Sequence, residues 1–177
     1  MAIFKMTFSI RSATLADAPA IQTIYAHHVL TGTGTFEIDP PDVADISARM
    51  SKVAARNWPW LVSVTEDNVI TGYAYAGPFR ERAAYNATVE DSIYVAPHAA
   101  GLGVGRALLV ALIEACRVSG ATEMLAVIGD SENHASIGLH KSAGFTEVGI
   151  MRNVGVKFGK TLDVVILQKS LSSLDAG

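Results

Sequence analysis

The sequence predicts an α/β protein of the α+β type, with a central, mostly antiparallel, twisted sheet flanked by helices. Runs with helical periodicity alternate along the chain with short runs rich in β-branched and aromatic residues. Short turns join most neighbouring β-rich runs, and these hairpins outnumber the helical crossovers that parallel strands need. Because 177 residues are enough for one sizeable core, we expect a single domain over residues 1–177.

The elements follow from local patterns. Thr14 and Asp17 form a start like a capping box, and apolar residues at helical spacing then predict a helix to about residue 30. Gly144 stands just after a later helix, where a left-handed residue is common. The other expected elements are, in order, a loop over 31–36, a helix over 41–56, a hairpin of strands over 60–64 and 69–75, a polar loop, a strand over 88–95, a helix over 106–118, a strand over 124–128, a helix over 133–142, and strands around 147–154 and 163–168.

Composition argues against several classes of function. The formal net charge is -3, so the chain lacks the basic character of a nucleic-acid-binding protein. No apolar run reaches the roughly 20 residues that cross a bilayer, so we expect no membrane partner and a cytoplasmic location. The single cysteine, Cys116, lies among leucines, which favours a buried structural thiol over a nucleophile.

A glycine-rich turn precedes the helix over 106–118. Gly101, Gly103 and Gly105 leave backbone N–H groups and the positive end of the helix dipole open to a phosphate. A plain turn is the alternative, but one glycine would be enough for it. No Lys-Ser or Lys-Thr pair closes the turn, and Arg106 or Leu108 stands where a dinucleotide fingerprint has its third glycine. A phosphate ligand outside these two nucleotide classes is therefore predicted.

Two runs carry a resemblance to a known family. Ile93-Tyr94-Val95-Ala96-Pro97 with the turn from Gly101 to Leu109 resembles the acetyl-coenzyme A motif of the GNAT acetyltransferase superfamily, and the run from Asn133 to Phe145 resembles its second cofactor motif. Residues 76–80, 88–95 and 156–160 are similar to one branch, the phosphinothricin and methionine sulfoximine or sulfone acetyltransferases. The resemblance spans about residues 10–171. It implies a GNAT acyltransferase fold, one acetyltransferase domain, acetyl-coenzyme A as co-substrate and a homodimer.

The resemblance also implies a set of cofactor contacts. Asn133 and Ser136 would contact the pantetheine arm or the phosphates, although Asn133 could equally be a helix cap. Relatives usually carry Arg or Gln where this chain has Ala100, so the diphosphate would rest on backbone amides, helped by Arg106. Backbone amides near Tyr94 and Val95 would hold the oxyanion. The expected cofactor-binding residues are Tyr94, Val95, Gly101, Gly103, Val104, Gly105, Arg106, Asn133 and Ser136.

Two residues are candidates for proton transfer. Glu90 lies in an apolar strand, where burial would raise its pKa and favour a general base, and it matches the catalytic glutamate of the branch. A strand carboxylate that points to solvent is the alternative. His140 stands where many superfamily members carry a tyrosine that protonates the leaving thiolate, so it could serve that step or assist Glu90. A histidine that only packs is the alternative there.

The acceptor pocket is expected from two loops that resemble those of the branch. Phe36, with Glu37 beside it, would cover the acceptor side chain, and Arg80, with Arg82, would bind its α-carboxylate. Tyr85 belongs to the same second loop, and a solvated surface loop is the alternative reading of these arginines. The other histidines have no ligand-like spacing, so no metal site is predicted: His27, His28, His98 and His134.

The sequence therefore predicts an N-acetyltransferase that moves the acetyl group of acetyl-coenzyme A to the α-amino group of a small amino-acid-like acceptor. Methionine sulfone, methionine sulfoximine and phosphinothricin are the expected kinds of acceptor. A protein amino terminus or another small amine is an alternative acceptor. Ala100 leaves open a non-catalytic module that binds coenzyme A.

Overall fold

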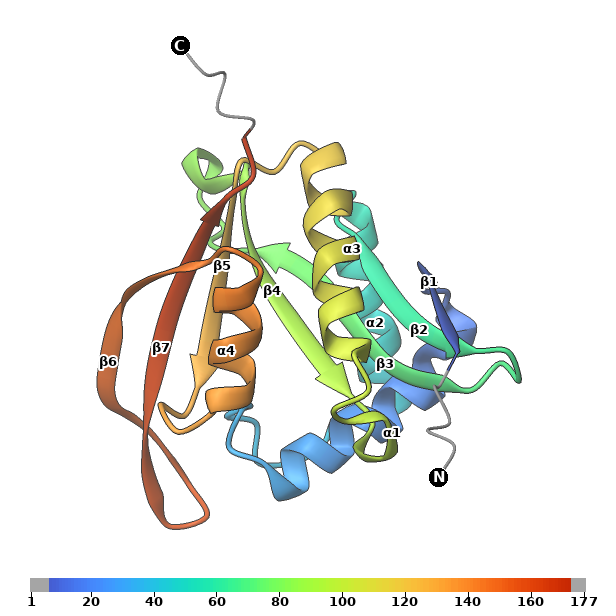
Figure 1. The fold of residues 1–177 in the computed structure, drawn as a ribbon, viewed down its shortest axis with the longest axis horizontal. Helices are drawn as coiled ribbons and strands as arrows, with labels where there is room; N and C mark the ends of the chain where they lie inside the picture. Colours follow the sequence, from blue (N-terminus) through green and yellow to red (C-terminus); the bar gives the residue numbers. More distant parts are fainter. Residues whose placement is uncertain (1–6, 173–177) are drawn as a thin grey trace.

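Seven strands form one sheet in the order β1-β2-β3-β4-β5-β7-β6 in the computed structural model, which describes residues 7–172 (Figure 1). Only β4 and β5 pair in parallel; the other neighbours are antiparallel, as the sequence predicts. The strands are β1 (Phe8–Ser12), β2 (Trp60–Thr65), β3 (Ile70–Pro78), β4 (Thr88–Val95), β5 (Glu123–Gly129), β6 (Thr146–Lys157) and β7 (Lys160–Ser170); the helices are α1 (Ala18–Thr31), α2 (Val43–Ala55), α3 (Val104–Val118) and α4 (His134–Ser142).

Helices cover both faces of the sheet, and each face has its own core. On one face α1 and α2 pack over β2 and β3, where Trp60 and Tyr73 lie among buried aliphatic residues. On the other face α3 packs over β3 and β4, with α4 beside it (Figure 1). The apolar stripe of α3 includes Leu108, Leu109 and Leu112, which are fully buried. Each contributes roughly 1.5–3 kcal/mol by leaving water, so this helix is a firm support for the turn that precedes it.

The parallel strands β4 and β5 separate part-way along their length. They pair only from Thr88 opposite Glu123 to Asp91 opposite Ala126. Beyond this point Ser92–Val95 continues along β3 alone, and Val127–Gly129 continues along β7 alone. The two strands diverge visibly in Figure 1. We call this opening the fork.

The structure differs from the expected elements at several ends. β1 was not predicted, because its five residues alternate weakly and are mostly exposed at the sheet edge. Thr14 caps a short 3-10 turn, Leu15–Asp17, and α1 begins only at Ala18. The helix expected from residue 106 begins at Val104, since Gly103 is the last left-handed residue, with φ of 85°.

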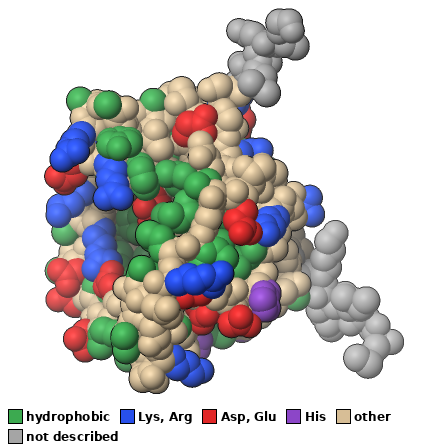
Figure 2. Space-filling model, turned by 90° about the vertical axis from the view of Figure 1, so that its left-hand side faces the viewer, with side chains coloured by type: hydrophobic (Ala, Val, Ile, Leu, Met, Phe, Trp, Pro, Cys, Tyr) green, Lys and Arg blue, Asp and Glu red, His purple; other side chains and the backbone are tan. Residues whose placement is uncertain are grey.

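The hairpin of β6 and β7 is longer than predicted. Its two-residue turn, Phe158 and Gly159, has φ of 52° and 71°, and Lys157 faces Lys160 across it. Positive φ at both central residues is the turn geometry that fits the twist of a hairpin. Exposed hydrophobic side chains gather on this hairpin, and Figure 2 looks onto this side of the molecule, where hydrophobic side chains are grouped about the centre. The exposed members are Val148, Ile150, Met151, Val154, Val156 and Phe158.

Candidate active site

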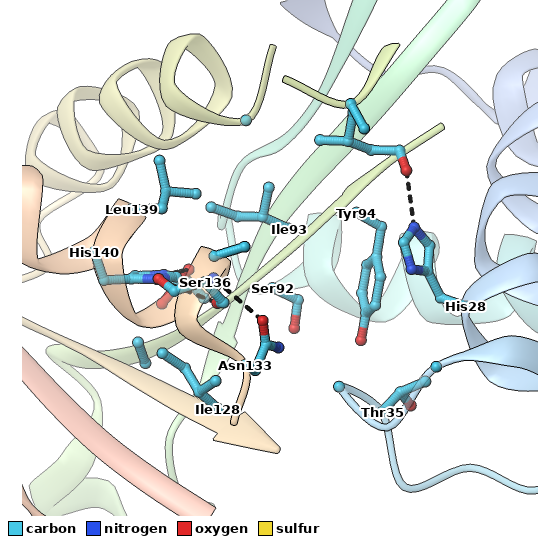
Figure 3. A pocket seen from close by; sticks show the side chains of 18 of the residues that line it. His28, Thr35, Ser92, Ile93, Tyr94, Ile128, Asn133, Ser136, Leu139 and His140 are labelled. Carbon is cyan, nitrogen blue, oxygen red and sulfur yellow. Dashed lines mark hydrogen bonds and ion pairs between the residues drawn. The ribbon is translucent and has the colours of Figure 1, made fainter. Parts of the chain in front are cut away.

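A cavity of about 670 Å³ occupies the fork. One wall is the separated end of β4, another is the start of α3, and a third is α4 with the turn before it (Figure 3). The loop Gly32–Thr35 borders its remaining side. A ligand in this space would therefore contact backbone from a strand, a glycine turn and two helices.

The glycine turn directs the amino end of α3 into the cavity. Gly101 and Gly103 have φ of 75° and 85°, a backbone conformation that favours glycine. A Cβ atom on either would meet nothing within 4 Å, so the space above the turn is open. Gly103 is the N-cap residue and has no side chain to bond the first N–H groups of α3. These N–H groups and the positive helix dipole form an anion site that suits a phosphate.

The separated end of β4 turns unpaired backbone groups toward the fork. The Ala96 amide donates to Thr71 O, and the Phe79 amide donates to Thr88 O. Hydrogen-bonded and non-bonded pairs alternate along an antiparallel ladder, so Ile93 and Val95 turn their backbone groups away from β3. Tyr94 instead faces Tyr73 across the ladder. The amides expected at Tyr94 and Val95 are therefore corrected to those of Ile93 and Val95.

His28 on α1 reaches this part of β4 from the other face of the sheet. Its Nε2 lies 2.8 Å from the carbonyl oxygen of Val95 and donates to it (Figure 3). Burial lowers the pKa of His28 below its ordinary value, which favours the neutral ring. The bond occupies the Val95 carbonyl, and it leaves the Val95 amide as a donor in the fork.

Two residues at the start of α4 border the cavity. The side-chain oxygen of Asn133 accepts a hydrogen bond from the Ser136 amide at 3.2 Å, so Asn133 is a helix cap (Figure 3). Such a cap contributes about 1 kcal/mol. Both side chains also line the cavity, so capping and ligand contact are compatible at Asn133.

His140 is buried in α4 and pairs with a carboxylate of β4. Its Nε2 lies 2.9 Å from Oδ2 of Asp91, and its Nδ1 lies 2.7 Å from the carbonyl oxygen of Ser136. Burial opposes the charged ring, but Asp91 and the Ser136 carbonyl outweigh it and raise the pKa of His140 above its ordinary value. Phe145 packs edge-on against the imidazole at 5.1 Å. His140 therefore contacts Asp91, and no hydrogen bond joins it to Glu90.

Glu90 points to the face opposite Asp91, because successive side chains of a strand alternate. It shares this face with Ser92 and Tyr94 and lies opposite Gly77 of β3. Burial, and then the charge of Asp91, raises the pKa of the Glu90 carboxyl above its ordinary value, whereas Arg80 opposes this shift. A carboxylate with a raised pKa is a better proton acceptor near neutral pH.

A partly buried polar network supports the loop that contains Phe36. Arg49 bonds both carboxylate oxygens of Glu37, at 2.6 and 3.1 Å. The Tyr25 hydroxyl donates to Glu37 Oε1 at 2.9 Å and contacts the Thr35 hydroxyl. Lys157, only 3% exposed, donates from Nζ to Thr35 O at 2.8 Å and so ties the β6–β7 hairpin to the loop. Glu37 thus supports the loop by accepting hydrogen bonds from Tyr25 and Arg49.

Two glycines hold the ring of Phe36. A Cβ atom on Gly129 would lie 2.9 Å from the ring, and one on Gly155 would overlap it. The ring therefore occupies a notch that exists only because both positions lack a side chain. This places Phe36 between the ends of β5 and β6, beside the loop that borders the cavity.

The loop between β3 and β4 lies outside the cavity. Arg80 stacks over Phe79 with its guanidinium carbon 5.0 Å from the ring centroid, and Tyr85 meets the same ring edge-on at 5.6 Å. Arg82 is exposed at the start of the short turn Ala83–Tyr85. The charge of Arg80 nevertheless opposes the raised pKa of Glu90, so its guanidinium is close enough to interact with this carboxyl.

The acetyltransferase (GNAT) domain family matches residues 10–166. This chain belongs to the GNAT family. A phosphinothricin N-acetyltransferase of Alcaligenes faecalis is 48% identical over 159 residues, 90% of this chain and 80% of that protein. An L-methionine sulfoximine/L-methionine sulfone acetyltransferase of Salmonella typhimurium is 43% identical over 166 residues, 92% of this chain and 94% of that protein. A GNAT phosphinothricin acetyltransferase of Sinorhizobium meliloti, crystallised with AcCoA, has a TM-score of 0.91 at 41% identity and covers 94% of this chain and 90% of its own.

These similarities confirm the expected GNAT fold, the N-acetyltransferase class and the resemblance to the phosphinothricin and methionine sulfoximine branch. Within residues 7–172, no helix is long and apolar enough to span a bilayer. In the same stretch, no three His, Cys, Asp or Glu side chains cluster as metal ligands.

The GNAT fork brings together all nine cofactor residues expected from the sequence, and it separates them from the expected acceptor residues. Those that line the cavity are Tyr94, Val95, Gly101, Gly103, Val104, Gly105, Arg106, Asn133, Ser136 and His140. Those that do not line it are Glu90, Phe36, Glu37, Arg80, Arg82 and Tyr85.

Besides the Ile93 amide, three side chains of this GNAT site are not predicted from the sequence. Asp91 follows Glu90 directly, and strand alternation alone predicts that one of the two carboxylates enters the apolar face under α3. Lys157 lies within a segment that resembles the branch, but its burial depends on the distant Thr35. His28 carries no sequence signal, since its bond to Val95 spans 67 residues.

Proposed function

We propose that this chain transfers the acetyl group of acetyl-coenzyme A to the α-amino group of a small amino-acid-like acceptor such as methionine sulfone, methionine sulfoximine or phosphinothricin. The observation that carries the proposal is the fork between β4 and β5, with the bare amino end of α3 at its mouth. A long ligand with a diphosphate at one end and an acyl group at the other suits this shape.

The diphosphate would bind at the glycine turn. The N–H groups that follow Gly101 and Gly103 supply donors, and Arg106 lines the same end of the cavity. Ala100 lines it without a charge, so binding there rests mainly on the backbone. The pantetheine arm would then run along the separated part of β4, within reach of Asn133 and Ser136.

The amides of Ile93 and Val95 would stabilise the oxyanion that forms when the amine attacks the thioester. Both turn away from β3 into the fork, where β5 no longer pairs with them. Donors that are fixed before reaction need no reorganisation as charge develops, and losing one such donor costs roughly 3–4 kcal/mol in other acyl transfers.

Glu90 would act as the general base. Its raised pKa suits removal of a proton from the acceptor ammonium, directly or through a water molecule. It lies on the face that carries Tyr75 and Tyr94, whereas the glycine turn starts α3 on the opposite face. The acceptor would therefore approach from the α1 and α2 face and the cofactor from the other, and the two would meet in the fork.

His140 would supply the proton that the leaving thiolate takes up. Its raised pKa keeps the ring protonated over more of the neutral range. It lines the cavity, and Ser136 of the same helix lies beside it (Figure 3). A role as second base beside Glu90 fits poorly, because Nδ1 donates to the Ser136 carbonyl and Nε2 shares a proton with Asp91, so neither nitrogen has a free lone pair to accept another proton.

The acceptor would be held by the two loops on the Glu90 side. Phe36 would cover the side chain of the acceptor. The hydrogen bonds of Glu37 with Tyr25 and Arg49 would hold the loop that carries Phe36. Arg80 would pair with the α-carboxylate, with Arg82 and Tyr85 nearby in the same loop. A guanidinium binds a carboxylate through two parallel hydrogen bonds, which would orient the amino group one carbon away.

We further propose a homodimer that uses the hydrophobic face of β6. Val148, Ile150, Val154 and Val156 leave exposed apolar side chains on an edge strand, which a second copy would cover. Light scattering after gel filtration would give twice the monomer mass, and Val156→Lys would lower it toward that of the monomer.

An acceptor panel tests the proposed reaction. Purified protein would be mixed with acetyl-coenzyme A and methionine sulfone, methionine sulfoximine, phosphinothricin, unmodified amino acids, simple amines or peptides with free amino termini, and free thiol would be measured. Fastest release with the amino-acid sulfone, sulfoximine or phosphinothricin supports the proposal. Preference for peptides or simple amines, or no release with any acceptor, contradicts it.

A further inference from the structure

Asp91 is a buried carboxylate at the point where the fork opens. It is the last residue of β4 that pairs with β5, and its side chain lines the cavity. Asp91 is 7% exposed and its partner His140 is 3% exposed. Oδ2 contacts the ring, whereas Oδ1 has no hydrogen-bond partner within residues 7–172. A buried carboxylate with one free oxygen needs charge compensation from the partner that it has.

The hydrogen bonds of His140 fix how many protons this pair holds. A carbonyl oxygen only accepts, so the bond to Ser136 O requires a proton on Nδ1. Nε2 then faces Asp91 Oδ2 at 2.9 Å, and this contact requires one further proton between the two atoms. With Asp91 ionised, that proton lies on Nε2 and the ring is an imidazolium.

We propose that Asp91 is a positioning residue for acyl transfer, which holds His140 as an imidazolium that can only donate a proton. This inference rests on the proposed function, in which His140 protonates the leaving thiolate. The two proton transfers would then take place on opposite faces of β4. Glu90 accepts a proton on one face, and the Asp91–His140 pair donates a proton on the other.

In the proposed reaction, Glu90 and His140 each carry one proton transfer. The acceptor ammonium gives one proton to Glu90, and the free amine attacks the thioester carbon to form the C–N bond. The C–S bond breaks with its electron pair on sulfur, and the Nε2 proton of His140 passes to that sulfur. The new amide nitrogen loses its second proton to solvent, Glu90 gives its proton to solvent, and solvent returns one proton to His140. Each turnover releases one proton, as the overall reaction of an ammonium with a thioester requires.

The charge of Asp91 raises the pKa of two neighbouring groups. It contributes to the raised pKa of Glu90 from the same strand. Burial, and then Asp91, raises the pKa of Cys116 on α3 to about 12, so this thiol stays protonated at neutral pH. Loss of the Asp91 charge should therefore lower the pKa of both His140 and Glu90, whereas Cys116 remains a neutral thiol.

The test is Asp91→Asn, which keeps the shape of the side chain and can still hydrogen-bond His140. Histidine-labelled protein would be followed by NMR across pH, and kcat would be measured across pH with acetyl-coenzyme A and methionine sulfone. We expect the titration of His140 to move to lower pH by roughly 1–3 units. The high-pH limb of kcat should move by the same amount, with kcat about 10-fold lower above neutral pH and KM for acetyl-coenzyme A within about 2-fold.

Asp17→Asn is the matched control. Asp17 is also a buried aspartate in an ion pair, with Arg11 at 2.8 Å, and it does not line the cavity. It should lower stability and leave the pH profile in place. If His140 titrates alike in wild type and Asp91→Asn, or if it shifts while the kcat profile does not, the inference is wrong. The spectra test protonation even if methionine sulfone is not acetylated, a result that would contradict the proposed acceptor instead.

Discussion

Glu90 and Asp91 are consecutive residues of β4, yet their carboxylates lie on opposite faces of the sheet. Asp91 pairs with His140 of α4, and Glu90 faces the side of Tyr75 and Arg80. The two charges still interact, because Asp91 contributes to the raised pKa of Glu90. One dipeptide thus connects the acceptor side of the site with the cofactor side.

Glu90→Gln should lower kcat by about 10²-fold or more, because an amide cannot accept the ammonium proton. Binding of acetyl-coenzyme A, measured by calorimetry, should stay within about 2-fold, since Glu90 does not line the cavity. The wild-type rate should also fall as pH drops through the raised pKa of Glu90. Unchanged turnover in Glu90→Gln at all pH values would remove this residue from the mechanism.

Arg80→Ala should lower kcat/KM for methionine sulfone by about 30-fold or more, because the acceptor carboxylate would lose its charged partner, a loss of roughly 2–5 kcal/mol. It should also move the acidic limb of the pH profile to higher pH, since Arg80 lowers the pKa of Glu90. Steady-state kinetics across pH would measure both effects.

A methyl ester of the acceptor gives the control for Arg80. Esterification should be costly for the wild type and nearly neutral for Arg80→Ala, since the two changes delete one interaction and should not add. Equal rates of the wild type with the ester and the free acid would show that the carboxylate is not recognised.

Ala100→Arg should tighten binding of coenzyme A at low salt and do so less at high salt. Ala100 lines the cavity beside the glycine turn, and an added exposed cation there acts through a screened charge interaction. Calorimetric titrations at two salt concentrations would measure the difference. If affinity is the same at low salt, the diphosphate does not pass near this position.

Gly155→Ala should displace Phe36 from its notch, because the new methyl group would overlap the ring. We expect kcat/KM for the acceptor to fall by about 10-fold or more, with little change in binding of acetyl-coenzyme A. Gly149→Ala is the matched control on the same strand, since a Cβ atom there meets nothing within 4 Å. Equal losses in both variants would mean that Phe36 does not cover the acceptor.

The sequence was informative where a local pattern determines local structure. The stripe of α3, the glycine turn and the hairpin of β2 and β3 are visible in short windows, and each was predicted to within a few residues. Gly103 could be placed at the turn because only a residue without Cβ adopts its conformation easily. The motifs of the family then extended this local reading to the whole fold.

The site was harder to predict, because its contacts join residues far apart in the chain. Lys157 meets Thr35 across 122 positions, and Asp91 meets His140 across 49. The pattern that marks β4 as a strand does not say which carboxylate faces which helix. Ile93 rather than Tyr94 faces the fork for a similar reason, since the register with β3 decides it.

The Asp91–His140 pair should also make stability depend on pH in the neutral range. The pKa of His140 is raised in the folded state, so the folded state binds this proton more tightly than the unfolded state. The stabilisation is complete below the ordinary pKa of about 6.5 and is lost as pH rises through the folded pKa. Urea unfolding from pH 6 to 9 should therefore show a free energy of unfolding that declines with pH for the wild type. The decline should be smaller in Asp91→Asn, by about 1.4 kcal/mol for each unit by which the variant lowers the pKa of His140.

Asp17→Asn is the control for this pH dependence. It should keep the decline above pH 6 and change the free energy of unfolding at acid pH instead, because Arg11 lowers the pKa of Asp17 to about 2 and that stabilisation is lost only as pH falls through this value. Parallel curves for wild type and Asp91→Asn over this range would show that His140 is not held protonated by Asp91.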